Sequence, residues 1–248
     1  ANISLDELDA IVIGHAHLDH TGFLPVLTKY GYRGPIYCTE PTLPMMNLIQ
    51  LDAIKVAGAQ GRTPMYAERD VHQIMKQTIG LSYGTVTDIS PDIKLVLANA
   101  GHILGSASCH FHIGNGDHNF VYSGDIKYGK SMLLESADTR FPRVETLLVE
   151  STYGAKEDIQ PTREEVEGAF IKSVNEILKG GGKVLIPIPA VGPILKSPPT
   201  VIASLSFQVI APSADPAAAL CKCNSPFSKY ILFASSAAIY SHLVFTES

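Results

Sequence analysis

The cysteines of this sequence are few and have no regular spacing. Four occur in 248 residues, and they form neither a C-x-x-C pair nor an evenly spaced framework. Small secreted domains held together by disulfides carry many cysteines, whereas proteins of reducing compartments rarely use them as crosslinks. We therefore exclude a disulfide scaffold and expect a cytoplasmic location.

Long apolar runs and an excess of basic residues are also lacking. The most apolar late stretch, residues 230–245, is interrupted by three serines and a histidine. It falls short of the roughly 20 apolar residues that span a bilayer, and no secretory signal opens the sequence, so we expect no membrane anchor. The net charge is −5. Because affinity for phosphates comes from clustered Lys and Arg, any RNA binding must be local.

Charged residues are scarce towards the C-terminal end. Residues 193–248 carry only five of them, which are Lys196, Asp215, Lys222, Lys229 and Glu247. Amphipathic helices need a charged face, so we expect an atypical tail of uncertain fold here. The sequence also begins without Met and places a single strand before its first motif. Both features predict an incomplete chain.

Short strands alternate with helices before residue 150. Runs rich in β-branched or aromatic residues predict strands at residues 9–14, 34–38, 93–98, 107–113, 119–123 and 146–150. Apolar periodicity and capping signals predict helices at residues 24–30, 42–57 and 69–79. This alternation predicts an α/β fold with packed sheets.

A second pattern begins after residue 160. Thr162 and Glu165 form a capping box, and apolar residues then recur at helical spacing as far as a run of three glycines at residues 180–182. A strand is predicted at residues 183–188. The order of strand, helix and strand predicts a βαβ unit that begins a second subdomain.

The segment His15-Ala-His-Leu-Asp-His20 directly follows the first predicted strand. His15 and His17, two residues apart in an extended loop, project to the same side, while Asp19 and His20 can turn towards a neighbouring point. Imidazole and carboxylate groups are the ligands that zinc prefers in open catalytic sites. Three histidines and an aspartate in six residues therefore favour two metal ions over a merely polar loop.

Two later polar residues also follow predicted strands and adjoin glycine. His102 follows Gly101, and Asp125 follows Gly124. Alone, each is typical of a turn or a cap, but together with the first motif they become candidate ligands. By contrast, His110 and His112 alternate along a strand with apolar neighbours, which predicts a solvated strand face.

These motifs together resemble the metallo-β-lactamase superfamily. The resemblance lies in residues 15–22 (HAHLDHTG), 101–106 (GHILGS) and 122–125 (YSGD), and residues 150–154 (ESTYG) are similar to the β-CASP branch. Within that branch the sequence most resembles the archaeal and bacterial ribonucleases of the cleavage and polyadenylation specificity factor type. The resemblance runs from about residue 5 to Gly192, after which a truncation or a shifted reading frame is expected.

The resemblance implies an αββα sandwich and a division of the chain into three parts. Residues 1–150 would form a metallo-β-lactamase-like domain that is incomplete because it lacks its first strands. Residues 151–192 would begin a β-CASP subdomain, and residues 193–248 would be the tail. Of these boundaries, only the start of the tail at residue 193 is also marked by composition, because charged residues are scarce from there on.

The resemblance also implies two zinc ions and a role for each motif residue. His15, His17 and His102 would bind one ion, Asp19 and His20 would bind the second, and Asp125 would bridge both. Asp19 and Glu150 are the expected catalytic residues, with Glu150 orienting a later histidine that protonates the leaving group. The family needs two further histidines, but only His242 follows His118. We therefore expect the second zinc to be under-ligated.

The function implied is zinc-dependent cleavage of RNA, by an endonuclease, an exonuclease or both. Two adjacent zinc ions lower the pKa of a shared water and neutralise charge on the attacked phosphate. RNA is the expected partner, and a homo-oligomer remains open. Two alternatives stay open as well: hydrolysis of β-lactams or other small amides and thioesters at the same site, and a catalytically incomplete fragment. Glu150 favours RNA.

Overall fold

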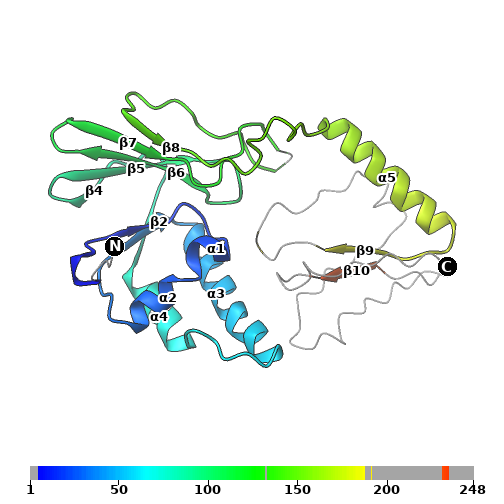
Figure 1. Cartoon of the computed structure of the whole chain (residues 1–248), viewed down its shortest axis with the longest axis horizontal. Coiled ribbons are helices and arrows are strands. Elements are labelled where there is room, and N and C mark those ends of the chain that lie inside the picture. The colour runs from blue at the N-terminus through cyan, green and yellow to red at the C-terminus, as the bar shows by residue number, and fades with distance from the viewer. Residues whose placement is uncertain (1–4, 132, 188–190, 192–230, 235–248) are drawn as a thin grey trace. The chain divides into compact units, whose positions relative to one another are not determined.

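The computed structural model describes residues 5–131, 133–187, 191 and 231–234 of the chain (Figure 1). These residues fall into two units. The first comprises Ala1–Ser151 with Val191–Pro193, and the second comprises Thr152–Ala190 with Ile194–Ser248. Each unit has its own packing, so the two are treated separately.

The first unit begins with a parallel three-stranded sheet and a layer of helices. A 3-10 turn (η1, Leu5–Glu7) precedes the strands β1 (Ile11–Val12), β2 (Ile36–Thr39) and β3 (Thr78–Leu81), which lie in the order β1-β2-β3. The connections are α1 (Leu18–Thr21), α2 (Leu24–Lys29), α3 (Thr42–Ala59) and α4 (Glu68–Gln77). Successive side chains of β2 alternate between two cores, as the period of a strand requires. Ile36 and Cys38 pack in the core that also includes Met46 of α3 and Ile74 of α4.

A second sheet packs on the other face of the first one, as Figure 1 shows for the green strands. Its order is β4 (Thr87–Ser90), β5 (Ile93–Asn99), β6 (Ala107–Ile113), β7 (His118–Tyr122) and β8 (Thr146–Leu148). All pairs are antiparallel except β7 and β8. Tyr37 of β2 meets Leu95, Leu97 and Cys109 in the core between the sheets. The α/β class and the packed sheets predicted from the sequence are confirmed.

Two strands of the first unit were not predicted. Residues 78 and 79 were expected to end a helix, but Thr78 has an extended ψ of 129° and begins β3. The β-branched pair Thr78 and Ile79 loses less side-chain freedom in a strand than in a helix, and β3 completes the pairing of β2. β4 also lies outside the strands predicted from the sequence, and it pairs with β5 through an irregular register at Asp88 and Ser90.

The outer face of the second sheet carries the pair His110 and His112, and the predicted solvated face is wrong for His110. This residue is only 3% exposed. The chain after β7 covers it: the ring of Phe141 meets the His110 ring at 5.5 Å in an edge contact, and Glu145 accepts hydrogen bonds from Asn119. The alternation of residues along β6 cannot predict that a segment distant in the sequence covers this face.

The second unit contains α5 (Arg163–Lys179), β9 (Val184–Pro187) and β10 (Ile231–Ala234). The predicted capping box is confirmed, since the Thr162 amide donates to Glu165 Oε2 at 2.7 Å and the Glu165 amide donates to the Thr162 hydroxyl at 3.3 Å. β9 pairs in parallel with β10. Apart from β10, the predicted tail, including His242, lies outside the described residues. Within the described residues, no helix is long and apolar enough to cross a bilayer.

Candidate metal centre

The first motif lies at the end of β1 and is only partly a loop. The expectation of a loop throughout residues 15–20 is wrong, because the single turn α1 begins at Leu18 and carries Asp19 and His20. The Thr21 hydroxyl fixes this turn, lying 3.1 Å from the His17 carbonyl oxygen. His15 and His17 therefore precede a helical turn, and the other two motif residues lie within it.

His102 lies in a tight loop between β5 and β6. The Ala100 amide donates to the Ser106 carbonyl at 3.0 Å and closes the loop. Gly101 has a φ of +71°, and a Cβ there would lie 2.7 Å from the Lys127 carbonyl oxygen. Glycine is thus required before His102 both by its dihedral angle and by its close neighbour.

Asp125 follows β7 through Ser123 and Gly124. The Ser123 carbonyl accepts a hydrogen bond from the Ser108 hydroxyl at 2.9 Å, and Gly124 has a φ of +57°. The positive φ of Gly124 produces a turn after β7, directly before Asp125.

Four potential ligand atoms from these three segments converge. His17 Nδ1 lies 3.0 Å from His15 Nε2 and 3.2 Å from His102 Nε2. Asp125 Oδ2 lies 3.6 Å from His15 Nε2 and 3.5 Å from His102 Nε2. All four atoms lie within 4.8 Å of one another. In tetrahedral zinc sites, metal–ligand bonds of about 2.0–2.1 Å separate the ligand atoms by about 3.3–3.4 Å. The spacing and the donor set thus fit one zinc-sized ion.

The tautomer of His17 agrees with this fit. Its Nε2 lies 3.1 Å from the Val191 carbonyl oxygen, which can only accept, so Nε2 carries the proton and Nδ1 presents a lone pair. One lone pair cannot serve both neighbouring imidazoles as a well-aligned acceptor. A cation at the common point accounts for the contacts of all three nitrogens. Metal-bound histidines commonly donate their other N–H to a backbone carbonyl in this way.

A second, more open set of atoms surrounds His20. Its Nε2 lies 3.3 Å from Asp125 Oδ1 and 3.4 Å from Asp19 Oδ2. The two oxygens of Asp125 thus face different histidine groups. The Asp19 side chain is 76% exposed, so the set of Asp19, His20 and Asp125 is open to solvent on one side.

Comparison with known proteins identifies the family. Residues 1–152 match the family described as the metallo-beta-lactamase superfamily domain. The chain belongs to the metallo-β-lactamase superfamily. The resemblance stated from the motifs is thereby confirmed, and the two packed sheets are the fold expected of it.

Several relatives of this superfamily member are archaeal proteins. It is 84% identical over 192 residues to the transcription termination factor FttA of Cenarchaeum symbiosum, a match that covers 77% of this chain and 30% of that protein. The FttA proteins of Methanothermobacter thermautotrophicus and Lokiarchaeum are 56% and 55% identical over 189 residues, covering 76% of this chain and 30% of each relative. The chain therefore spans less than a third of the length of these relatives.

Burial lowers the pKa of two imidazoles of the centre, those of His15 and His102. Burial, reinforced by His20, His17 and His102, lowers the pKa of His15 to about 3. Burial also lowers the pKa of His102, with His17 acting in the same direction and Asp125 in the opposite one. Both rings are neutral at pH 7, which leaves a lone pair free for a cation without first displacing a proton.

Glu150, the β-CASP motif residue, holds the chain beside Asp125. Its Oε1 accepts a hydrogen bond from the Ile126 amide at 2.7 Å, and its own amide donates to the Ser123 hydroxyl at 3.1 Å. Glu150 thus braces both sides of Asp125, with its carboxylate at Ile126 and with its backbone amide at Ser123. His242, the one histidine that follows Glu150 in the sequence, lies outside the described residues.

Several supporting groups were not predicted from the sequence, among them the Val191 carbonyl, the Ser123 hydroxyl and the Ile126 amide. Two of the three are backbone groups, whose partners leave no trace in residue type. His15 Nδ1, by contrast, is buried with no hydrogen-bond partner among the described residues. The signal that could have pointed to Val191 is its proximity to Gly192, where the family resemblance ends.

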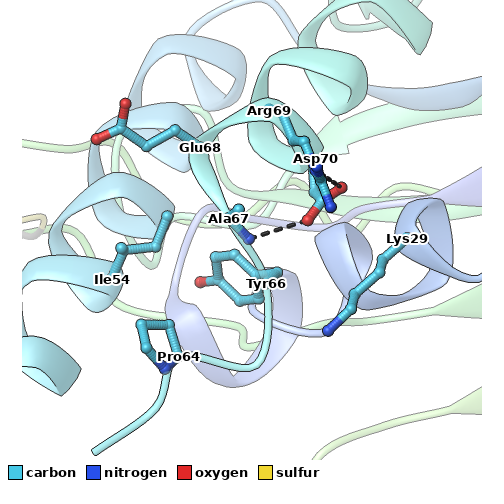
Figure 2. Close-up of a pocket in the computed structure, with 8 residues that line it drawn as sticks. All are labelled: Lys29, Ile54, Pro64, Tyr66, Ala67, Glu68, Arg69 and Asp70. Carbon is cyan, nitrogen blue, oxygen red and sulfur yellow. Dashed lines mark hydrogen bonds and ion pairs between the residues drawn. The ribbon is translucent and has the colours of Figure 1, made fainter.

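A pocket of about 380 Å³ lies away from this centre, at the start of α4 (Figure 2). Its charged groups are engaged locally: Asp70 accepts from the Ala67 amide at 2.9 Å, and Lys29 donates to the Met65 carbonyl at 2.9 Å. None of the predicted site residues lines it. We therefore regard this pocket as part of the capping of α4.

Proposed function

We propose that this chain carries the metal-binding core of a metal-dependent nuclease that cleaves RNA. The observation that carries the proposal is the position of Asp125, whose two oxygens face two histidine groups 3.3–3.6 Å away. A carboxylate placed in this way is suited to bridging two cations. Two adjacent metals supply an activated water near neutral pH and neutralise charge on a phosphate.

The proposed ligands follow the geometry. His15, His17, His102 and Asp125 would hold the first ion, while Asp19, His20 and Asp125 would hold the second. Imidazole and carboxylate donors at this spacing favour zinc. The second group offers only three side chains and is open to solvent, so we expect the second ion to bind more weakly.

The choice of RNA rests on the relatives and on Glu150. FttA proteins are named as transcription termination factors, and termination takes place at a growing RNA chain. Action there also agrees with a cytoplasmic location. Asp19 would bind the second ion beside the attacked phosphate, and Glu150 would fix the Asp125 segment and orient a later histidine.

Metal-dependent cleavage by the purified chain tests this function. We expect a labelled RNA to be cut in the presence of zinc, with cleavage abolished by a chelator and restored by added zinc. Asp19→Asn should lower the rate by at least about 100-fold, because it removes an anionic ligand beside the attacked phosphate. Elemental analysis of the same samples gives the zinc content per chain.

The matched control is Asp88→Asn, the same substitution on β4, where Asp88 pairs with Lys94 on the surface. It should cut RNA at the wild-type rate. Cleavage that ignores both the chelator and Asp19→Asn would indicate a contaminating nuclease and refute the proposal. A chain that binds zinc and leaves RNA intact would also refute it for this part of the protein.

A further inference from the structure

The loop that carries His102 is fastened by hydroxyl groups rather than by strand pairing. The Ser106 hydroxyl accepts hydrogen bonds from the amides of His102 at 3.0 Å and Ile103 at 3.2 Å. The Tyr83 hydroxyl donates to the Ser106 carbonyl at 2.9 Å. Ser106 is fully buried, so water does not compete for these bonds.

Two threonines, one at the end of β2 and one at the start of α3, hold the same loop at Gly105. The Thr39 hydroxyl lies 2.6 Å from the Gly105 carbonyl oxygen, the Thr42 hydroxyl lies 3.0 Å from it, and the two hydroxyl oxygens are 2.8 Å apart. Thr39 is 1% exposed and Thr42 is 0% exposed. A buried carbonyl left without a donor costs about 1–3 kcal/mol of stability. The threonine hydroxyls avoid this cost by donating to the Gly105 carbonyl.

Counting protons shows that the two hydroxyls are redundant. Two hydroxyl groups carry two protons, so at most two of the three contacts are hydrogen bonds at any moment. Either Thr39 or Thr42 alone can donate to Gly105. Removing one hydroxyl therefore leaves the carbonyl satisfied, and removing both leaves it with neither threonine donor.

The close approach of Thr39 and Thr42 requires glycine at position 105. Its φ is +77°, and a Cβ would lie 2.8 Å from the Thr42 hydroxyl oxygen and 2.9 Å from that of Thr39. Any larger residue would push the loop away from both threonines. The close approach of loop and hydroxyls thus depends on glycine at this position.

The threonines belong to the same frame as the first histidine motif. Thr39 ends β2 and Thr42 begins α3. β2 pairs with β1, and the Ile13 amide donates to the Tyr37 carbonyl at 2.8 Å, just before His15. A fixed point on β2 is therefore also fixed relative to His15 and His17.

We infer that Thr39 and Thr42 are positioning residues that hold His102 at the distance from His15 and His17 that a shared metal ion requires. This inference rests on the proposed function, because it assigns the two hydroxyls a purpose in metal binding. Partners outside the ligand sphere typically change metal affinity by about 10- to 100-fold. Thr39 and Thr42 contribute no ligand atom to the four that converge.

The test compares the double variant Thr39→Val/Thr42→Val with each single variant. Valine has nearly the shape of threonine and carries a methyl group in place of the hydroxyl, so it cannot donate to Gly105. We expect zinc affinity, measured by competition with a chelating dye, to fall by about 10- to 100-fold in the double variant. Each single variant should lose less than about threefold, because one donor remains. Thr39→Ser/Thr42→Ser should restore wild-type affinity.

Thr28→Val is the matched control for a lost buried hydroxyl. Thr28 is 3% exposed and donates within α2 to the Leu24 carbonyl at 3.3 Å. It should reduce stability without changing zinc affinity. Wild-type affinity in the double variant would overturn the inference, since the hydrogen bond from the Ala107 amide to the Gly14 carbonyl, at 2.7 Å, would then suffice to hold the loops together.

Amide hydrogen exchange in the metal-free chain separates this inference from the proposed function. The amides of His102 and Ile103 should exchange faster in the double variant, while those of α4 should not change. If the wild-type chain binds no zinc, the proposed function fails, and unchanged exchange would overturn the positioning role as well. Should the double variant not fold, Ser106→Ala removes a single oxygen atom from the same loop and should lower zinc affinity similarly.

Discussion

The chain contains two histidine pairs with the same spacing and different surroundings. His15 and His17 precede a helical turn and meet His102 and Asp125, so that four ligand atoms face one point. His110 and His112 lie on β6 with their rings 4.1 Å apart. Their neighbours are Asn119, Phe141 and Glu145, and that carboxylate already pairs with Arg143.

The difference teaches that a metal centre is made by convergence rather than by spacing. On β6 the two rings share a face because a strand alternates, and His112 Nδ1 already has a partner, Asn119 Oδ1, at 2.6 Å. Near β1, by contrast, three separate loops bring their donors together. The same H-x-H pattern therefore belongs to the proposed ligand set in one place and to a polar network in the other.

The largest expected effect comes from Asp125→Ala. Losing the carboxylate that faces both groups should release the second ion and weaken the first by about 100-fold, and RNA cleavage should fall to background. Zinc per chain at limiting free zinc is the measurement. Two ions bound as tightly as in the wild type would show that Asp125 does not join the two groups.

His20→Ala should have a more selective effect. It removes the donor that faces Asp125 Oδ1 at 3.3 Å and leaves the four ligand atoms of the first ion in place. We expect one ion of two to be lost while the first keeps its wild-type affinity, as read from a two-step zinc titration. Loss of both ions together would mean that the groups form one indivisible site.

The sequence predicted the parts of the fold that depend on local pattern. β6 has the predicted bounds, residues 107–113, and the capping box at Thr162 begins α5 as expected. The sequence pattern did not predict β3, because residues 78 and 79 continue the helical pattern before them and Gly80 follows, so that only the pairing with β2 shows the strand. Burial of His110 was missed for a similar reason, since the covering segment is distant in sequence.

The candidate site divides in the same way. The first motif places four potential ligands within six residues, so their residue types alone indicate metal chemistry. These are His15, His17, Asp19 and His20. His102 and Asp125 are marked by the adjoining glycines. Thr39 and Thr42 carry no such mark, because a threonine that holds a loop resembles any other threonine until the fold places Gly105 beside it.

A third prediction concerns the pH dependence of stability. Burial, aided by His112, lowers the pKa of His110 below 6.5, while hydrogen bonds with Arg143 and Asn119 and the charge of Glu145 act in the opposite direction. Below pH 6.5 the unfolded chain takes up a proton that the folded chain resists, so the fold loses stability as the pH falls. His110→Gln should lessen the fall in Tm between pH 7.5 and 5.5.

Both proteins in this comparison are kept metal-free with a chelator, because His15 and His102 also have lowered pKa values. Their contribution is the same in the two chains and cancels in the difference. An equal fall in Tm for the wild type and for His110→Gln would mean that His110 is solvated in solution, as its alternation on β6 first indicated.

The smallest expected effect is that of His112→Phe. The substitution keeps a ring on the outer face of the sheet and removes the donor to Asn119 Oδ1, a neutral hydrogen bond that contributes about 0.5–1.5 kcal/mol. We expect the free energy of unfolding in urea to fall by about 1 kcal/mol, with zinc content unchanged. His72→Phe, at an exposed position of α4, controls for the added apolar surface. A loss of zinc in His112→Phe would show that the pair on β6 also affects metal binding. The contrast between the two histidine pairs would then no longer hold.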